Sequence, residues 1–359
     1  MKSRVWKGLF YLLLLPAAIA FSGWQGWSWW SWATDPVETP SAAAEPIEGQ
    51  EAIQIEIPIG TPSQQIGRDL EAAGLIRSST AWNLWTRWQL LRQPEGGYQA
   101  GTYVLSPTQP LEDIAGILWA GEVVTRSFTI PEGWNREQIA AALAQEGFFP
   151  AAEFLQLTET IPAERYPWLP KDIPHLEGFL FPDTYQIPAE QITPEAIMTL
   201  MLDRFESTAL PVYQQQPNAM ELLDWVTLAS IIEKEAVVSD ERSTIAGVFS
   251  NRLEAGIPLG ADPTVEYGLG IRQTPENPLT YAQVETPNPY NTYLNAGLPP
   301  TPIANPGLAS LEASLNPADT EFLYFVARYD GTHIFSRTLQ EHEAAQIRIR
   351  DEIDAQSAN

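Results

Sequence analysis

The sequence predicts an α+β protein that one N-terminal transmembrane helix holds to a membrane. Three observations support this prediction. Residues 8–34 carry no charge, strand-like and helix-like segments then follow in an irregular order, and there is no regular strand–helix alternation of the kind that builds a doubly wound sheet. With 359 residues, the chain is long enough for two or three domains that each bury an apolar core.

Charge and cysteine content exclude several classes of function. The chain has 20 Lys and Arg against 45 Asp and Glu, and the resulting net charge of −25 opposes binding to nucleic acid. It contains no cysteine, which excludes disulfides, thiol nucleophiles and Cys-ligated metals. The three histidines have no paired spacing, and no nucleophile elbow, P-loop or dinucleotide fingerprint occurs in a convincing context. We therefore expect neither a metal nor a cofactor.

The uncharged segment 8–34 is long enough to cross a bilayer, whose core of about 30 Å needs about 20 helical residues. Five tryptophans at its end would form an interfacial belt, and three basic residues precede it. This predicts a cytoplasmic stub and anchor over 1–33 in the inner (plasma) membrane, with the rest of the chain outside. A cleaved signal peptide is the alternative, because Ala18-Ile19-Ala20 resembles a cleavage site.

Residues 34–51 are rich in Pro, Ala and acids, which predicts a linker. A regular pattern then occupies residues 52–121. The expected elements are a strand at 53–57, a helix opened by a capping box at 61–64 and ended by Gly74, a helix at 80–91, a strand at 98–105, and a helix at 111–120 closed by Gly121. This β-α-α-β order resembles the LysM type of glycan-binding module.

One turn pattern occurs twice. The Ile-Pro-x-Gly turn at 57–60 and the glycine stop at Gly74 recur at 130–133 and Gly147. The recurrence reflects either duplication of a wall-binding unit or two ordinary strand–helix units that share turn chemistry.

Residues 122–350 are expected to form a larger mixed α+β domain, with 351–359 as a tail. The expected elements are a strand at 123–130, helices starting at Asn135, Thr193 and Asn218, loops over 256–307, a hairpin of 322–328 with 332–336, and a final helix from about Leu339.

The carboxylates are the remaining candidates for chemistry. In the helix from Asn218, which a capping box with Glu221 is expected to open, a rotation of about 100° per residue places Glu233 on the apolar stripe. Glu235 falls on the side of Glu221 and Asp224, where solvent is expected. A carboxyl removed from water has a raised pKa and suits a general acid.

A purely structural role for Glu233 is equally compatible with its position. In that role its carboxyl bonds a backbone group or pairs with Arg242 or Arg252. The helix also carries Leu223, Leu228 and Ile231 on its other sides, so burial of the whole helix is the alternative to burial of one stripe.

Several ordered motifs share residues with one known family. They are EGFLFPDTY (177–185), ASIIEKE (229–235), DPTVEYG (262–268), YNTY (290–293), GLPPTPIANPG (297–307), and YFV with HIFS (324–336). With these motifs the chain resembles the MltG (YceG-like) endolytic murein transglycosylases over nearly its whole length. Gly260-Ala261 departs from the polar pair that is common in the family.

The resemblance implies a membrane-anchored lyase that cuts peptidoglycan strands internally at the MurNAc-GlcNAc bond, leaves 1,6-anhydro-MurNAc ends and limits strand length beside peptidoglycan synthases. The glutamate it implies as catalytic is Glu233. This residue would protonate the leaving oxygen and then help the MurNAc 6-hydroxyl attack the anomeric carbon. Two alternatives remain: a hydrolase with Glu233 as acid and Asp262 or Glu177 as base, and a non-catalytic wall-binding scaffold.

Seven further residues are candidates for substrate binding, each with a structural alternative. Glu177 and Asp183 would bind sugar hydroxyls or support the Glu233 helix. Tyr290, Asn291 and Thr292 would donate hydrogen bonds to N-acetyl groups or anchor their own loop. Asp262 and Thr264 would contact substrate, or Asp262 would order the loop through an Asx-type bond with Thr264.

Overall fold

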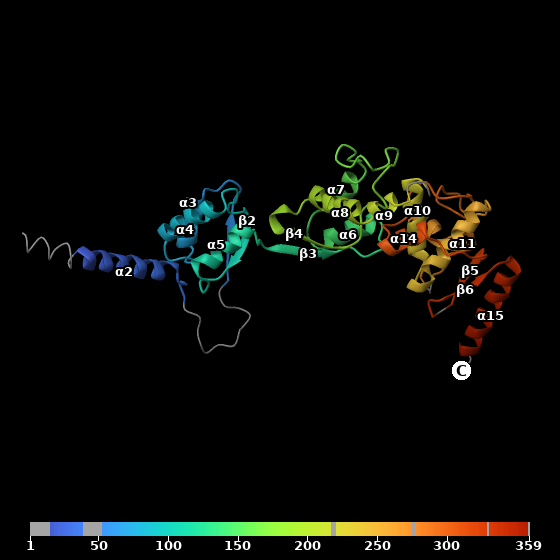
Figure 1. Cartoon of the computed structure of the whole chain (residues 1–359). Coiled ribbons are helices and arrows are strands. Elements are labelled where there is room, and N and C mark those ends of the chain that lie inside the picture. The colour runs from blue at the N-terminus through green and yellow to red at the C-terminus, as the bar shows by residue number, and fades with distance from the viewer. Residues whose placement is uncertain (1–14, 39–51, 217–219, 275–276, 329, 358–359) are drawn as a thin grey trace, which may run out of the picture. The chain divides into compact units, whose positions relative to one another are not determined.

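The structure is a computed structural model that describes residues 15–38, 52–216, 220–274, 277–328 and 330–357. The chain forms two compact units (Figure 1). Unit 1 comprises Met1–Arg126 with Gln186–Gln191, and unit 2 comprises Ser127–Tyr185 with Ile192–Asn359. Helices are interspersed with three two-stranded sheets in the described residues, so the predicted α+β class is confirmed.

Unit 1 contains the predicted β-α-α-β arrangement. Strands β1 (Ile53–Ile57) and β2 (Gly101–Leu105) pair antiparallel, with Ile53 opposite Leu105. Helices α3 (Ser63–Ala72) and α4 (Ser79–Arg92) connect them, and α5 (Leu111–Ala120) follows. The predicted capping box at 61–64 is wrong: the N-cap of α3 is Pro62, which offers no side-chain acceptor.

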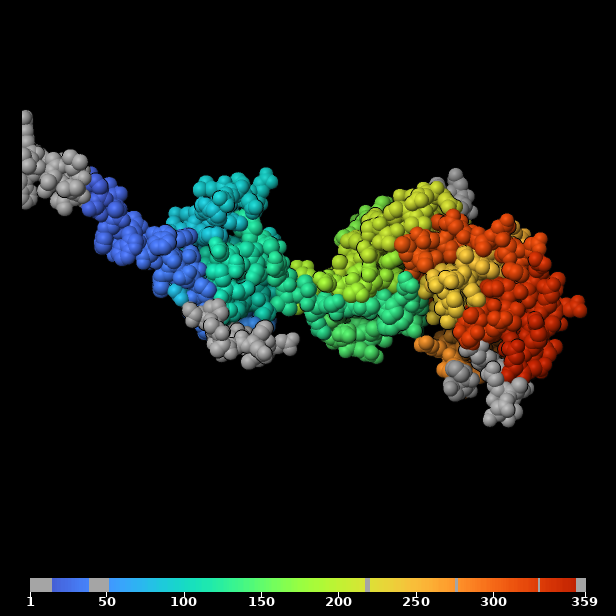
Figure 2. Space-filling view, turned by 60° about the horizontal axis from the view of Figure 1, so that its bottom comes forward, coloured from blue at the N-terminus to red at the C-terminus, as the bar shows by residue number. Residues whose placement is uncertain are grey.

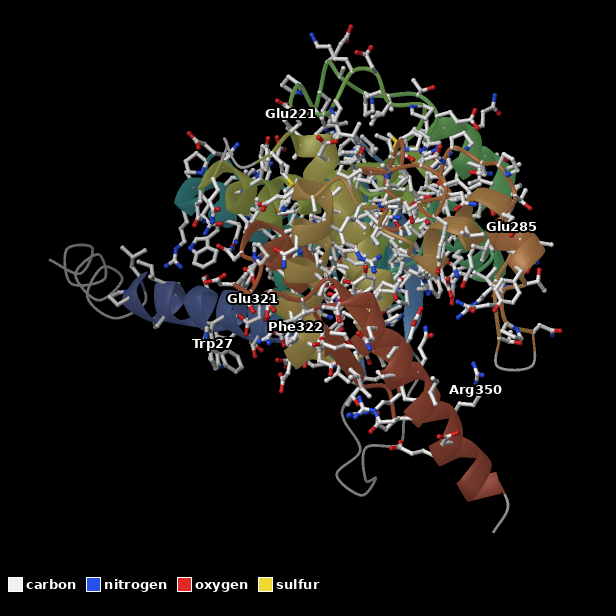
Figure 3. The ribbon with its side chains drawn as sticks, turned by 90° about the vertical axis from the view of Figure 1, so that its right-hand side faces the viewer. Trp27, Glu221, Glu285, Glu321, Phe322 and Arg350 are labelled. Carbon is white, nitrogen blue, oxygen red and sulfur yellow. The ribbon has the colours of Figure 1, made fainter. Side chains whose placement is uncertain are left out.

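Helix α2 (Leu15–Thr34) carries the second half of the predicted anchor. Its last turn packs on the rest of unit 1, where Ala33 is fully buried and Arg77 donates to the Trp32 carbonyl. Earlier tryptophans such as Trp27 project outward (Figure 3). In the described part of the chain, no helix is both long enough and apolar enough to cross a membrane. Residues 8–14 of the predicted span lie outside the described residues, so the anchor stays a prediction.

Unit 2 is built around helix α10 (Leu222–Glu235). Helix α14 (Leu308–Leu315) packs along it, and α11 (Arg242–Glu254) also contacts it (Figure 1). Helix α12 (Asp262–Leu269) is a further contact of α10. Every residue from Trp225 to Ile232 is buried, so the helix is enclosed all round rather than along one stripe. Its C-terminal end, with half-buried Glu233 and exposed Lys234, follows directly on this buried part.

The other elements of unit 2 surround this centre, and the C-terminal segment, orange to red in Figure 2, covers much of the face shown there. They are α6 (Arg136–Gln145), α7 (Ala151–Leu157), α8 (Pro194–Thr208), α9 (Leu210–Gln214), α13 (Tyr281–Val284), β5 (Tyr324–Ala327), β6 (His333–Ser336) and α15 (Leu339–Ser357). Strand β3 (Thr125–Thr129) pairs with β4 (Thr184–Pro188), and each of these two strands has residues in both units. The hairpin of β5 and β6 and the helix from Leu339 agree with the predictions.

Two predictions for unit 2 are wrong, the start of one helix and the absence of helices from one segment. Helix α10 begins at Leu222, directly after Glu221 (Figure 3), so Glu221 is its N-cap rather than part of a capping box; Asn218 lies outside the described residues. The segment 256–307 is not all loop, because it contains α12 and α13. These helices are eight and four residues long, too short to show a helical period in the sequence.

Candidate active site

Glu233 is half-buried near the end of α10, and one of its oxygens is bonded by α14. Oε2 accepts hydrogen bonds from the Ser310 hydroxyl at 2.6 Å and from the Gly307 backbone N–H at 3.2 Å. Gly307 is the N-cap of α14, so the carboxyl lies at a helix N-terminus, where backbone N–H groups stabilise negative charge. Oε1 has no hydrogen bond among the described residues and remains available for proton exchange.

Two loops meet beside this carboxyl. Gly133 donates its backbone N–H to the Asn305 carbonyl, and Asn305 donates through its backbone N–H and its side-chain amide to the Trp134 carbonyl. A Cβ atom on Gly133 would lie 3.4 Å from Glu233 Cγ, and its φ of +74° favours glycine. The second copy of the Ile-Pro-x-Gly turn is therefore part of the Glu233 site.

Glu177 is buried behind these loops and holds them together. Its two oxygens accept from the Arg136 backbone N–H at 3.1 Å, and the Asn305 amide and Tyr267 hydroxyl also donate to it. Burial raises the pKa of Glu177 to about 7, against the lowering effect of the Arg136 N–H. At 2% exposure this side chain corresponds to the supporting role considered for it.

Glu235 has other surroundings than helix phase predicted, and it is only partly exposed. Burial raises its pKa to about 8, the charges of Asp262 and Glu266 act in the same direction, and Arg252 opposes them. The prediction of a solvent-exposed Glu235 beside Glu221 and Asp224 is therefore wrong. Its neighbours belong to α11 and α12, which the sequence of α10 does not place.

The predicted polar motifs of the 262–292 region mostly bond to one another. Thr264 and Thr292 are buried, with their hydroxyl oxygens 2.8 Å apart, and Thr264 donates to the Ala261 carbonyl. The Asx-type bond between Asp262 and Thr264 is not formed; Asp262 accepts from the Tyr293 hydroxyl at 2.6 Å instead. The helical start at Asp262 directs this carboxyl toward Tyr293.

Asn291 and Asp183 are likewise occupied. The Asn291 amide donates to the carbonyls of Val284 and Thr286, and its side chain is fully buried. Asp183 forms an ion pair with Arg204 at 2.5 Å. These contacts correspond to the loop-supporting alternatives, and neither residue contacts Glu233.

A cavity of about 580 Å³ lies next to the Glu233 site within unit 2. Gly133 and Lys234, which flank Glu233, form part of its wall, although Glu233 itself does not. Tyr290 also lines it, with its ring packed edge-on against Tyr267 at 4.9 Å between centroids. Of the predicted binding residues, only Tyr290 and Glu177 line this cavity.

Two further observations define the chemistry of the cavity. Burial lowers the pKa of His175 in its wall to about 4, and the charge of Arg136 acts in the same direction, which favours the neutral imidazole at neutral pH. In the described part of the chain, no group of three His, Asp or Glu side chains is placed to hold a metal ion.

Sequence reasoning missed Ser310, Asn305 and Gly307 as partners of the site. Asn305 and Gly307 lie in the PIANPG motif, for which the sequence predicts no particular role, and Ser310 belongs to no motif at all. Only the packing of α14 against α10 brings its first turn to Glu233. The general signal would have been a glycine followed by a short apolar helix.

The fold and this site agree with one protein family. Residues 55–348 match the model of the YceG-like family, and the chain belongs to that family.

Three relatives illustrate the family. The chain is 34% identical over 319 residues to the endolytic murein transglycosylase of Bacillus subtilis. The aligned region covers 84% of this chain and 86% of that protein. It is 31% identical to the endolytic murein transglycosylase of Streptococcus pneumoniae serotype 2, over 81% of this chain and 57% of that longer protein. A crystal structure of a putative YceG-like protein from Listeria monocytogenes superposes with a TM-score of 0.55 at 34% identity, over 83% of this chain and all of the other.

Proposed function

We propose that this YceG-like protein is a lyase, an endolytic peptidoglycan transglycosylase, and that Glu233 is its catalytic residue. The observation that carries the proposal is the position of Glu233: its Oε2 is held by Ser310 and the α14 N-terminus, and the residues beside it line a polar cavity. The curated relatives with the name endolytic murein transglycosylase support the substrate class and the reaction.

One carboxyl is sufficient for this reaction. Glu233 gives a proton from Oε1 to the glycosidic oxygen as the bond to the anomeric carbon breaks. The resulting carboxylate accepts the proton of the MurNAc 6-hydroxyl, whose oxygen bonds to the same carbon and closes the 1,6-anhydro ring. Ser310 and the Gly307 N–H stabilise the intermediate carboxylate, because hydrogen bonds to a charged acceptor are strong. Water takes no part.

Substrate binding is assigned to the cavity beside Glu233. Tyr290 offers an aromatic face and lies at the wall, with its hydroxyl bonded to Thr301. Asn291, Thr292 and Thr264 act from behind by ordering the loop that presents Tyr290, and Glu177 acts similarly on the Asn305 loop. Asp262 and Asp183 are not assigned to substrate.

The proposal also includes the location of the enzyme. Residues 1–33 anchor it in the inner (plasma) membrane, the LysM-like module of residues 52–121 contacts glycan, and the enzyme limits strand length beside the synthases. If the anchor is present, the full chain stays with membranes after alkaline extraction, and a variant lacking residues 1–33 is released. Release of the full chain would contradict the anchor.

The test of the reaction is digestion of purified peptidoglycan with the full chain in detergent. Mass spectrometry of the products should detect 1,6-anhydro ends with the native protein and none with Glu233→Gln. Glu221→Gln, at the exposed start of the same helix, is the matched control and should retain activity. Reducing ends would instead support a hydrolase, and binding without cleavage by the native protein would support a scaffold; either result overturns the proposal.

A further inference from the structure

A second carboxylate lies beside Glu233. Glu132 is the x residue of the Ile-Pro-x-Gly turn that precedes α6, and it is exposed as a residue. Its carboxyl nevertheless reaches the Cα of Gly307, because a Cβ atom on that glycine would overlap both carboxyl oxygens. The same Gly307 donates its backbone N–H to Glu233 Oε2 at 3.2 Å. Glu132 and Glu233 thus approach one residue of the α14 N-terminus.

The turn itself does not require an acid at this position. The matching turn in unit 1 has the same glycine conformation, with φ of +81° at Gly60 and +74° at Gly133. Its x residue is Ile59, which is 95% exposed and contributes nothing to a core. Turn geometry therefore accounts for the glycine but not for the carboxyl of Glu132.

The positive charges around the pair come from two elements, α11 and α10. Arg242 at the start of α11 faces Glu132, and its Nε is buried without a hydrogen-bond partner among the described residues. Lys234, next to Glu233 on α10, directs its amine to the Gly133 carbonyl at 3.4 Å. Helix α14 contributes the neutral Ser310 hydroxyl, and its N-cap Gly307 contributes a backbone N–H. The acid of α14, Glu312, lines a different pocket together with Arg242. Among the described residues, Glu233 is the acid whose charge acts on Glu132.

We propose that Glu132 is a positioning residue that forms a coupled pair with Glu233, so that the two carboxyls together retain one proton until the glycosidic oxygen arrives. The proposal rests on the function proposed for Glu233. Two neighbouring carboxylates resist simultaneous ionisation, so one proton stays on the pair to higher pH than on either carboxyl alone. Glu132 does not contact the substrate; the shared proton reaches the glycosidic oxygen from Glu233, and the same proton balance is restored when Glu233 accepts the proton of the 6-hydroxyl.

The environment of Glu132 agrees with this coupling. Burial of its carboxyl raises the pKa of Glu132, the charge of Glu233 raises it further, and Arg242 opposes both. Loss of the pair's last proton removes the general acid. The alkaline limb of the activity profile should therefore report the pair, whichever carboxyl holds the proton at rest.

The experiment compares pH profiles of kcat/KM for the full chain and its Glu132→Gln variant. The alkaline midpoint of the variant should move about one pH unit lower, since a like charge nearby is removed. Glu132→Asp should keep a midpoint close to the native one, because it keeps the charge. Glu153→Gln removes an exposed acid of α7 and serves as the control, with an unchanged profile. An unchanged midpoint in Glu132→Gln overturns the proposal, whatever the rate.

A second measurement keeps this test separate from the proposed function. In protein with ¹³C-labelled glutamate carboxyls, the Glu132 signal should titrate at lower pH in Glu233→Gln than in the native chain. This readout needs no activity. A Glu132 titration that does not respond to Glu233→Gln overturns the coupling, whereas absence of cleavage by the native chain overturns only the function.

Discussion

Glu233 and Glu235 lie two residues apart on α10, and the surroundings of both differ from those that helix phase predicted. Glu233 was expected to be the one acid on a buried stripe, yet α10 is buried all round and Glu235 is the acid whose pKa burial raises to about 8. What distinguishes Glu233 is its partner. It meets the first turn of α14, whereas Glu235 faces Arg252, Asp262 and Glu266.

The hydroxyl of Ser310 is expected to contribute to catalysis. Ser310→Ala removes a 2.6 Å hydrogen bond to Glu233 Oε2. A hydrogen bond to a charged group contributes about 1.5–3 kcal/mol, so kcat/KM should fall about 10- to 100-fold. Ser314→Ala is the matched control one turn later, because that hydroxyl bonds only the Leu311 carbonyl of its own helix. Equal effects of the two substitutions would contradict a role for Ser310.

The raised pKa of Glu235 makes stability depend on pH. Its folded-state pKa of about 8 lies above the ordinary value of 4.5, so its stabilising contribution is present below pH 4.5 and is lost as pH rises through 8. Glu177, with a pKa of about 7, acts in the same direction. The unfolding temperature should therefore fall between pH 5 and pH 8.

Glu235→Gln should reduce that fall, because the amide stays neutral. Unfolding temperatures from circular dichroism at pH 5 to 9 measure the effect, and 1 kcal/mol corresponds to about 2–4 °C in a unit of this size. Glu221→Gln, an exposed acid of the same region, should leave the pH dependence unchanged. A Glu235→Gln curve parallel to the native one would contradict the raised pKa.

At the scale of elements, helix ends were predicted better than helix surroundings. Gly121 ends α5 in the left-handed conformation, and Asn135 and Thr193 cap α6 and α8 through their side chains, because these signals act within a few residues. Helix α12 was missed although Asp262-Pro263 opens it and Gly270 closes it. Its eight residues are too few to show an apolar helical period, so the start and stop signals alone did not indicate a helix.

Packing of α3 on α4 depends on one glycine. A Cβ atom on Gly67 would lie 2.5 Å from the buried Trp82 ring, so Gly67→Ala should destabilise unit 1 by about 1–3 kcal/mol through overpacking. Gly116→Ala on α5 meets nothing within 4 Å and should instead stabilise the helix by about 0.5–1 kcal/mol. Chemical denaturation of both variants measures the difference. Equal effects would contradict the packing argument.

At the scale of the whole molecule, each unit has its own apolar core. Trp82, Tyr103 and Leu70 lie in that of unit 1, and Leu228, Ile231 and Phe249 lie in that of unit 2. Scanning calorimetry should therefore resolve two transitions. Gly67→Ala should lower the unfolding temperature of the unit 1 transition only. Glu235→Gln should change only the unit 2 transition, at alkaline pH. A single transition shifted by both substitutions would contradict separate cores.

The sequence alone determined the α+β class, the β-α-α-β order of unit 1, several helix ends and the resemblance to the YceG-like family, because these depend on local periodicity, caps and contiguous motifs. It did not predict α7, α11 or α14. Only the tertiary structure decided which groups meet Glu233. Ser310, Gly307 and Glu132 are 77, 74 and 101 positions away in the chain, and they reach one carboxyl because α14 packs on α10 and the 130–134 turn bonds the Asn305 loop. Contacts between segments so distant leave no period or spacing in a single sequence.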